Sequence, residues 1–345
     1  MKNLEASSFS SYEKIPTSLK KLGLNQYQYT ELDKIEWIVT EKIHGANFSF
    51  IYQDGRLHYG KRKEYLDWKD DFFGFQLVVN KLESQIISFF EELMQTIEAE
   101  KYIIYGELFG GEYPHSEVEK VESLQAIQTG IYYSPTIEFC AFDIAFETEN
   151  IKTYLDYDKA IRLFETHKLL YAKNLFIGKL NEALEFDIRI NSTIPIQLNL
   201  PNFKNNLIEG IVIKPLQELD TEIFPNRPIL KIKNPEFEEN KAFHEAQKWS
   251  FVPNISSNTE ELQFLVEELR NYITQNRLQS AISKIGKLDF DNSERIEEIR
   301  EEFVKDILID FDQDNDTILV ELSSHQKQWI EERITADCQK FMSKK

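Results

Sequence analysis

The sequence predicts an α+β domain of antiparallel sheets with flanking helices, followed by an all-helical C-terminal domain. Segments of alternating apolar residues are interrupted by helical segments in the first part of the chain, which is typical of the α+β class. From Thr259 onward the apolar residues recur at helical spacing only. The 345 residues suffice for two domains. We expect them over residues 1–245 and 256–345, with a linker over residues 246–255.

The stretch "EWIVTEKIHGANFSFIYQDGRLHYGKRK" predicts strands joined by a tight turn. Large apolar residues alternate with smaller or polar ones on both sides of an Asp-Gly pair, which is a strong hairpin signal. This prediction places Lys42 just before one strand. It places Lys61 and Arg62 at the far end of the partner strand.

Further strands and helices follow from the same patterns. Strands are expected in "KYIIYGELFGGEY", "IEFCAFDIAFE", "LIEGIVIKPL" and "PILKIKN". Helices are expected in "FFGFQLVVNKLESQIISFFEELMQTIEA", "DYDKAIRLFETHKLL", "SERIEEIREEFVKDILI" and "SHQKQWIEERITADCQKFM". The acidic run "DQDND" lacks the glycine and the glutamate that a calcium loop requires, so an acidic turn is expected there.

Composition limits the class of protein. The net charge of −19 argues against nucleic-acid binding over the whole surface, because such proteins are usually basic. Affinity depends on where the positive charge lies, so a local cationic cleft remains compatible with a polyanionic ligand. Cys140 and Cys338 form neither a disulfide framework nor a zinc pattern. With no apolar run of membrane-spanning length, we expect a cytoplasmic protein without a membrane partner.

The K-x-x-G pattern at Lys42 is weak by itself. A second copy begins at Lys20, with nothing chemical around it. A functional interpretation of Lys42 therefore depends on charged residues that recur at apolar strand ends far along the chain. These are Lys61, Arg62, Glu107, Asp143, Glu209, Lys214, Lys231 and Lys233.

Each of these residues also has a simpler structural explanation. Glu107 could be a strand-end carboxylate that faces water, and Asp143 could be a satisfied acid in the core. Lys231 and Lys233 alternate along one strand face and could protect the solvent side of an edge strand. Taken together, however, charged residues at several strand ends are what a cleft lined by sheet edges would produce.

The ordered motifs K-x-H-G, Y-G-E-L-F-G, F-D-I, E-G-I-V-I-K-P and L-K-I-K resemble those of covalent polynucleotide ligases and mRNA capping enzymes. The string "EWIVTEKIHGANFS" resembles the RNA ligase 2 family in particular, because His44 stands where DNA ligases and capping enzymes usually have aspartate. The resemblance covers about residues 30–240. It implies a nucleotidyltransferase domain of ATP-grasp-like fold. The helical C-terminal part differs from the β-rich module that DNA ligases and capping enzymes usually carry.

The resemblance implies an ATP-dependent RNA ligase that takes part in RNA repair. It would join 3′-hydroxyl and 5′-phosphate ends, at nicks in duplex RNA, through a lysyl-adenylate and an RNA-adenylate. Pyrophosphate and AMP would be released, with Mg²⁺ or Mn²⁺ as the metal. We expect a monomer. Two alternatives remain open: a DNA ligase or capping-type nucleotidyltransferase, and a non-catalytic RNA-binding protein on a ligase scaffold.

Lys42 is the expected nucleophile for the α-phosphate of ATP. An amine attacks only in its neutral form, which nearby cations and partial burial favour. Lys231 and Lys233, together with a metal ion, would supply this positive field and stabilise the phosphoryl oxygens. His44 is expected to act after the adenylate forms, when AMP moves to a 5′-phosphate end.

The remaining roles are those that the resemblance implies. Glu209 and Asn47 would hold a hydrated Mg²⁺, which prefers oxygen ligands. The nucleotide would be bound by Glu41 at the adenine amino group, Phe142 at the adenine face, Glu107 at the ribose, and Arg62 at ribose and phosphate, together with Lys42, Asn47, Glu209, Lys231 and Lys233. Asp143 would support this pocket from behind, and Lys214 would contact a phosphate.

Overall fold

The computed structural model describes residues 9–149, 151–235, 265–266, 268–315 and 318–343. The chain divides into two compact units, Met1–Asn234 and Pro235–Lys345. The linker expected over residues 246–255 lies outside the described residues, as does the domain boundary expected at residue 245.

The larger sheet of the N-terminal unit is antiparallel and has six strands in the order β4-β3-β2-β5-β6-β7. The strands are β2 (Ala46–Gln53), β3 (Arg56–Lys61), β4 (Tyr65–Leu66), β5 (Lys101–Glu112), β6 (Ser134–Thr148) and β7 (Ile151–Tyr154). The predicted hairpin is confirmed, because Gln53 of β2 pairs with Arg56 of β3. Asp54 and Gly55 between them adopt φ of 52° and 71°, as a tight primed turn requires.

The smaller sheet is antiparallel and has four strands in the order β10-β9-β1-β8. The strands are β1 (Trp37–Glu41), β8 (Asn174–Gly178), β9 (Gly210–Pro215) and β10 (Leu230–Lys233). The sequence did not predict β8. Its apolar residues are consecutive rather than alternating, so it carries no period-2 signal, and it becomes a strand by pairing along β1.

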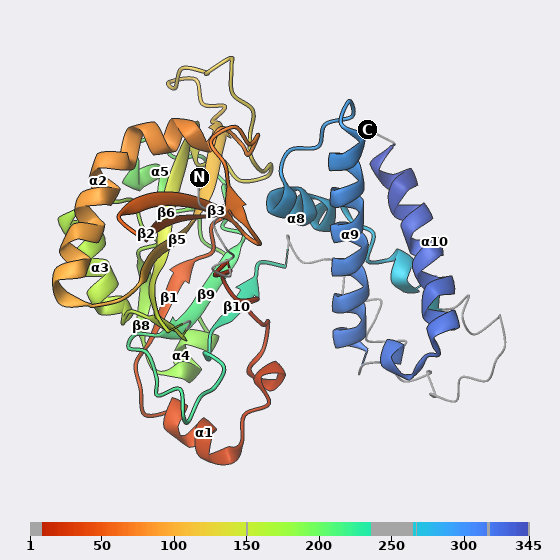
Figure 1. Cartoon of the computed structure of the whole chain (residues 1–345), viewed down its shortest axis with the longest axis horizontal. Coiled ribbons are helices and arrows are strands. Elements are labelled where there is room, and N and C mark those ends of the chain that lie inside the picture. The colour runs from red at the N-terminus through yellow and green to blue at the C-terminus, as the bar shows by residue number, and fades with distance from the viewer. Residues whose placement is uncertain (1–8, 150, 236–264, 267, 316–317, 344–345) are drawn as a thin grey trace. The chain divides into compact units, whose positions relative to one another are not determined.

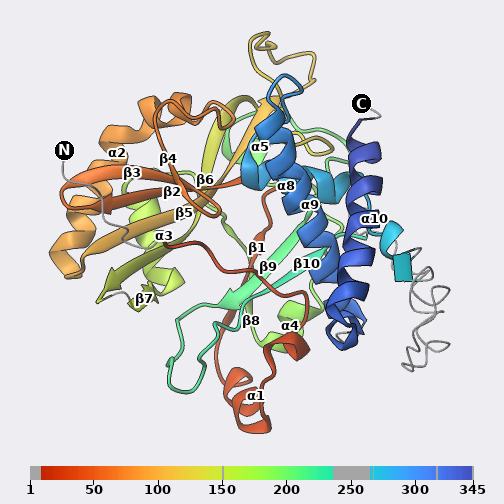
Figure 2. The ribbon, with the colours of Figure 1, turned by 45° about the vertical axis from the view of Figure 1, so that its right-hand side comes forward.

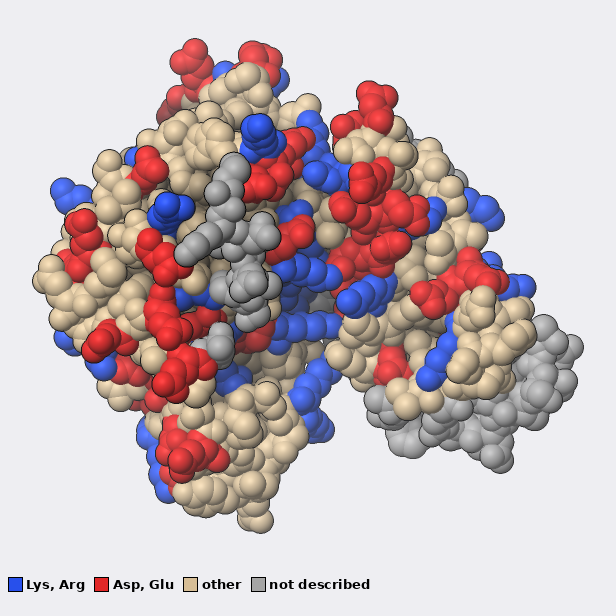
Figure 3. Space-filling model, in the orientation of Figure 1, with Lys and Arg blue, Asp and Glu red and all other residues tan. Residues whose placement is uncertain are grey.

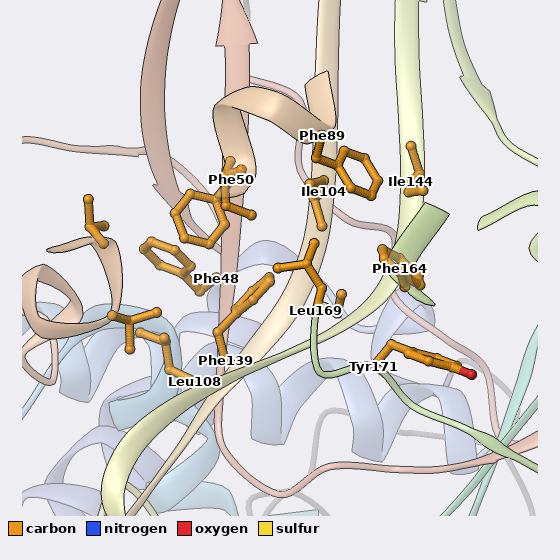
Figure 4. Packing of buried hydrophobic residues seen from close by; sticks show 14 of the residues in the cluster. Phe48, Phe50, Phe89, Ile104, Leu108, Phe139, Ile144, Phe164, Leu169 and Tyr171 are labelled. Atoms are coloured by element: carbon orange, nitrogen blue, oxygen red, sulfur yellow. The ribbon is translucent and has the colours of Figure 1, made fainter. Parts of the chain in front are cut away.

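Two helices cover the outer face of the larger sheet, α2 (Phe75–Thr96) and α3 (Tyr157–Thr166), and both were predicted (Figures 1 and 2). Their buried rings, among them Phe89 and Phe164, pack in one cluster with Phe48, Phe50 and Phe139 of the sheet (Figure 4). Each buried ring contributes roughly 1.5–3 kcal/mol, so this layer holds the sheet rigid.

The opposite face of the larger sheet is turned toward the smaller sheet. Ile51, Ile103 and Tyr105 form an inner core with Ile229, against which Val212 of β9 packs. Side chains alternate between the two faces of a strand. Residues in phase with this inner core therefore lie between the sheets, where a ligand can be enclosed.

The smaller sheet has a core of its own. Two short helices contribute to it: α1 (Gln26–Leu32) supplies Leu32 and α4 (Leu180–Leu184) supplies Leu180, and both pack with Trp37 of β1. A third short helix is α5 (Ile194–Gln197). The second K-x-x-G copy lies in a 3₁₀ turn (Leu19–Leu22) that Gly23 ends with φ of 63°, so that copy has a structural explanation.

The C-terminal unit is helical over its described residues, as predicted. Its helices are α8 (Gln275–Ile285), α9 (Ser293–Asp314) and α10 (Ser324–Met342), with a 3₁₀ turn at Ile318–Glu321. The expected acidic turn is wrong for residues 312–314, which belong to α9, because the buried face of that helix extends to Phe311. Asp316 lies outside the described residues. Within the described part of the chain, no helix is long and apolar enough to cross a membrane.

Candidate active site

The loop that contains Lys42 passes from β1 of the smaller sheet to β2 of the larger sheet. The Lys42 backbone N–H donates to the Gly210 carbonyl at 3.0 Å. Gly45 ends the loop against β5, where an added Cβ would lie 2.0 Å from the Leu108 carbonyl oxygen. Only glycine fits this approach, which explains the glycine of the K-x-H-G pattern in physical terms.

Glu209, directly before β9, is the centre of a charge cluster. Its Oε2 lies 2.5 Å from Lys42 Nζ and 3.3 Å from His44 Nδ1. Its Oε1 lies 3.5 Å from Lys233 Nζ. Burial raises the pKa of Glu209, but the neighbouring charges of Lys42, His44 and Lys233 outweigh burial and hold this pKa well below its usual value. Glu209 is therefore an ionised carboxylate surrounded by donors.

Lys231 and Lys233 lie on one face of β10, as the alternation predicted, and the structure shows that this is the inner face. They pair with Val212 and Gly210 of β9, and Val212 belongs to the core between the sheets. Burial lowers the pKa of Lys231 to about 7, and the neighbouring cations act in the same direction. The Lys231 N–H donates to the Pro16 carbonyl at 2.9 Å, so the N-terminal segment covers this strand edge. The strand edge is thus covered at Lys231, while the Lys233 side chain, which contacts Glu209, is 33% exposed.

The larger sheet contributes Asn47, Glu107 and Arg62. Asn47 and Glu107 are direct partners in the β2–β5 ladder and share one face. Arg62 follows the last residue of β3. Burial raises the pKa of Glu107 to about 7, and the charge of Glu209 adds to this, while Lys42, Arg62 and the Gly45 N–H oppose it. These interactions show that Glu107 and Arg62 face the same cluster as Lys42.

A β-bulge places Phe142 and Asp143 on the same side of β6. Tyr105 pairs with Asp143 and Gly106 pairs with Ala141, so Phe142 is the extra residue. Phe142 packs against the inner core, with its ring 5.0 Å from that of Tyr12. Without the bulge, two consecutive residues would point to opposite faces.

The residue after Phe142 is Asp143, whose carboxylate is buried. Tyr12 Oη donates to Asp143 Oδ2 at 2.6 Å, and Arg227 Nη1 donates to the same oxygen at 2.8 Å. Lys214 Nζ donates to Asp143 Oδ1 at 2.7 Å and to the Phe142 carbonyl at 2.6 Å. Burial opposes ionisation, but Arg227 and Lys214 hold the pKa of Asp143 far below its usual value. Lys214 Nζ is therefore engaged with the Asp143 carboxylate and the Phe142 carbonyl, and its contact with a phosphate stays a prediction.

Glu41 is buried at the end of β1. Its Oε2 accepts hydrogen bonds from the Thr193 N–H at 2.8 Å and from Thr193 Oγ1 at 2.7 Å. Its Oε1 is buried and has no hydrogen-bond partner among the described residues. Burial raises the pKa of Glu41, and the Ser192 and Thr193 hydrogen bonds oppose this. A buried oxygen without a donor is costly, so this atom is suited to accept from a ligand N–H.

Sequence reasoning missed several residues that hold these groups. They are Tyr12, Tyr133, Thr193 and Arg227. None belongs to a recognisable motif, and only the fold brings them to their partners. The one available signal was Arg227, an isolated arginine just ahead of the L-K-I-K strand.

The charge distribution supports a local cationic site. Figure 3 shows Lys and Arg side chains gathered over the part of the N-terminal unit where β9 and β10 lie, on a surface otherwise rich in acidic residues. The net charge of −19 is thus compatible with a polyanionic ligand at this site.

The donor set fits Mg²⁺ or Mn²⁺. Glu209 offers carboxylate oxygens and Asn47 an amide oxygen. In the described part of the chain, no three His, Cys, Asp or Glu side chains form a ready-made metal cage. Mg²⁺ usually takes one or two protein carboxylates together with waters and substrate phosphates, so a sparse oxygen set is appropriate for it.

The fold and the candidate site are those expected of covalent nucleotidyltransferases, a class in which a lysine amine accepts a nucleotide. Comparison with known proteins narrows the class, and the chain belongs to the RNA ligase family, whose model matches residues 35–233. A second model, T4 RNA ligase 2 C-terminal, matches residues 256–340. This membership favours an RNA ligase over the DNA ligase and capping-enzyme alternatives.

Two relatives with similar sequences are named as RNA-editing ligases, which agrees with this family. The chain is 29% identical over 360 residues to RNA-editing ligase 2, mitochondrial, of Trypanosoma brucei brucei, covering 92% of this chain and 86% of that protein. It is 27% identical over 307 residues to RNA-editing ligase 1, mitochondrial, of the same organism, covering 73% of this chain and 64% of that protein.

Solved structures similar to the chain include RNA ligase of Naegleria gruberi. Its structure with PPi has a TM-score of 0.41 and 15% identity, covering 69% of this chain and 58% of that one. A mutant of that ligase with ATP and Mn has a TM-score of 0.44 and 16% identity, covering 68% of this chain and 58% of that one.

Proposed function

We propose that this protein is an ATP-dependent RNA ligase that seals nicks in duplex RNA. The observation that supports this most is the contact between Lys42 Nζ and Glu209 Oε2, in a cluster that also contains Lys233. It combines a nucleophilic amine, a carboxylate that can hold a metal ion, and cations for phosphate oxygens.

In the first step Lys42 Nζ attacks the α-phosphorus of ATP. The N–P bond forms, the bond from the α-phosphorus to the bridging oxygen breaks, and pyrophosphate leaves. The amine loses a proton before attack. Glu209 and Asn47 would hold a divalent cation, which when bound would supply positive charge at the phosphates. Lys231 and Lys233 stabilise the phosphoryl oxygens in the transition state.

The nucleotide pocket lies between the sheets. The Phe142 ring offers an apolar face to adenine. Glu41 Oε1, which has no partner among the described residues, accepts from the adenine amino group. Glu107 accepts from the ribose hydroxyls, and the Arg62 fork donates to ribose and phosphate.

In the second step a 5′-phosphate oxygen of RNA attacks the same phosphorus, and the P–N bond to Lys42 breaks. His44 assists this transfer. In the third step the RNA 3′-hydroxyl attacks the 5′-phosphate phosphorus, the phosphodiester forms and AMP leaves. The helical C-terminal unit binds the duplex RNA during these two steps.

We further propose that the protein is a monomer that acts in RNA repair in the cytoplasm. Both cysteines, Cys140 and Cys338, are buried and unbridged, which suits a reducing compartment.

The proposal is tested with α-labelled ATP and magnesium, followed by a panel of nicked duplexes. We expect label on the protein with ATP and little with GTP. Nicked duplex RNA should be sealed faster than single-stranded RNA or nicked duplex DNA. Equal sealing of nicked RNA and DNA would contradict the RNA preference, and labelling by GTP alone would support a capping-type enzyme.

A further inference from the structure

Three residues of the loop that contains Lys42 each form a hydrogen bond with a different neighbour. Lys42 is tied to β9 through the Gly210 carbonyl. The His44 backbone N–H donates to Tyr133 Oη at 3.0 Å. The Gly45 carbonyl accepts from Gln128 Nε2 at 3.3 Å. Tyr133 and Gln128 both come from the long connection between β5 and β6. This connection therefore hydrogen-bonds to the part of the loop that follows Lys42.

Tyr133 occupies a fixed place at the end of this connection. It is buried directly before β6, and its ring packs edge-to-face on Phe109 with centroids 5.2 Å apart. The preceding residue, Tyr132, is clamped by one side-chain amide. Asn206 Oδ1 accepts from the Tyr132 N–H at 2.9 Å, and Asn206 Nδ2 donates to the Tyr132 carbonyl at 2.7 Å. Both backbone groups of Tyr132, the residue before Tyr133, are therefore hydrogen-bonded to Asn206.

The clamp also connects this region to Glu209. Asn206 precedes Glu209 by three residues along the chain. The ring of Phe203, in the same segment, packs against the rings of Tyr113 and Tyr132, with centroid distances of 4.9 and 5.3 Å. Both ends of the β5–β6 connection thus rest on the segment that leads to Glu209.

The Tyr133 hydroxyl is suited to hold a backbone amide permanently. Burial raises the pKa of Tyr133 well above its usual value, and the charges of Glu41, Glu209 and Glu107 raise it further. The group therefore stays a neutral hydroxyl over the working pH range, and its oxygen accepts from the His44 N–H. The His44 ring in turn lies 3.3 Å from Glu209 through Nδ1, so a shift of the His44 backbone displaces the imidazole from Glu209.

We infer that Tyr133 is a positioning residue for His44, and that through it the β5–β6 connection controls the transfer of AMP from Lys42 to RNA. The inference rests on the proposed function. Because the Lys42 backbone has its own tie to Gly210, loss of the Tyr133 hydroxyl should leave Lys42 in place. The capture of AMP and its transfer to RNA should therefore separate.

The test compares Tyr133→Phe with Tyr102→Phe. Each change removes one hydroxyl and keeps the ring, and the Tyr102 hydroxyl donates to the Ile97 carbonyl at 2.7 Å, in the core cluster on the outer face of the larger sheet. The two rates are measured apart: formation of lysyl-adenylate from ATP, and single-turnover transfer of AMP from purified lysyl-adenylate to a nicked RNA duplex. Tyr133→Phe should keep the first rate within about twofold and lower the second at least about tenfold, as expected when a catalytic group is misplaced. Tyr102→Phe should keep both rates within about twofold.

A double-mutant cycle distinguishes positioning from general loosening. In a His44→Ala background, adding Tyr133→Phe should change the transfer rate by less than about twofold, because the group that Tyr133 positions is already absent. Asn206→Ala, which releases the clamp on Tyr132, should show the same selective loss of transfer if Tyr133→Phe does not fold.

Several results would overturn the inference. These are an equal loss of both rates in Tyr133→Phe, no loss of either rate, or additive effects of Tyr133→Phe and His44→Ala. Absence of any lysyl-adenylate in the unaltered protein would instead contradict the proposed function itself, and the inference with it.

Discussion

Lys42 Nζ lies 2.5 Å from Glu209 Oε2, although the two residues are 167 positions apart in the chain. The antiparallel pairing of β1 with β9 produces this contact. Glu41 pairs with Ile211, so Lys42, which follows Glu41, lies beside the residues that precede Ile211, among them Glu209. A metal ion that engages the Glu209 carboxylate would change the partner of the Lys42 amine, which connects metal binding to the nucleophile.

Lys231 and Lys233 should act on phosphates and contribute little to folding. Replacing either by Ala should slow lysyl-adenylate formation by about 10²–10³-fold, the effect of removing one preorganised donor from a transition state. The melting temperature should hardly change. Burial disfavours the charged form of the Lys231 amine and lowers its pKa to about 7, so this amine does not stabilise the fold. Lys81→Ala, which removes an exposed lysine paired with Glu138, serves as the control. If the melting temperature falls strongly while adenylate formation is retained, the lysines would instead protect the solvent side of an edge strand.

Binding of ATP should be coupled to uptake of a proton by Lys231. With its pKa lowered to about 7, this amine is mostly neutral in the free protein at pH 8. Phosphate oxygens favour the ammonium form and raise this pKa, so up to about one proton should be taken up per nucleotide at that pH. Calorimetry in buffers of different ionisation heat measures the uptake, with α,β-methylene ATP to prevent transfer.

Lys231→Met supplies the control for this coupling, because it keeps the apolar stem and removes the titrating group. Its proton uptake at pH 8 should be close to zero. Net release of protons by the unaltered protein, or unchanged uptake in Lys231→Met, would show that another group titrates.

A chain that ends at residue 250 should separate adenylate formation from sealing. The first activity needs only the small nucleotide and the N-terminal site, so it should survive. Sealing needs a positioned duplex and should fall steeply. RNA binding by the full chain should weaken as salt rises, because counterions are released when phosphates are neutralised. Sealing of nicks by the shortened chain at the full rate would refute a role of the C-terminal unit in holding RNA.

Local patterns predicted those parts of the site that depend on one strand at a time. Alternation in "LKIK" was sufficient to put Lys231 and Lys233 on one face, and the Asp-Gly pair located the β2–β3 hairpin. The K-x-H-G string predicts Lys42 as the nucleophile, but only together with motifs far along the chain.

Features that depend on pairing between distant segments could not be predicted in this way. The bulge at Phe142 exists only relative to Tyr105 and Gly106 on β5. Lys214 is in a motif, but the contact of its amine with the buried Asp143 carboxylate joins two distant segments of the chain. The hold of Tyr133 on His44 likewise joins two loops with no shared sequence signal.

The most direct test of the account is the intact mass of the protein after incubation with ATP and magnesium. The unaltered protein should gain the mass of one AMP, and peptide mapping should place it on Lys42. Lys42→Ala should show no added mass, while Lys20→Ala, which changes the second K-x-x-G copy, should behave as the unaltered protein does. An AMP adduct that persists in Lys42→Ala would contradict the assignment of Lys42 as the nucleophile.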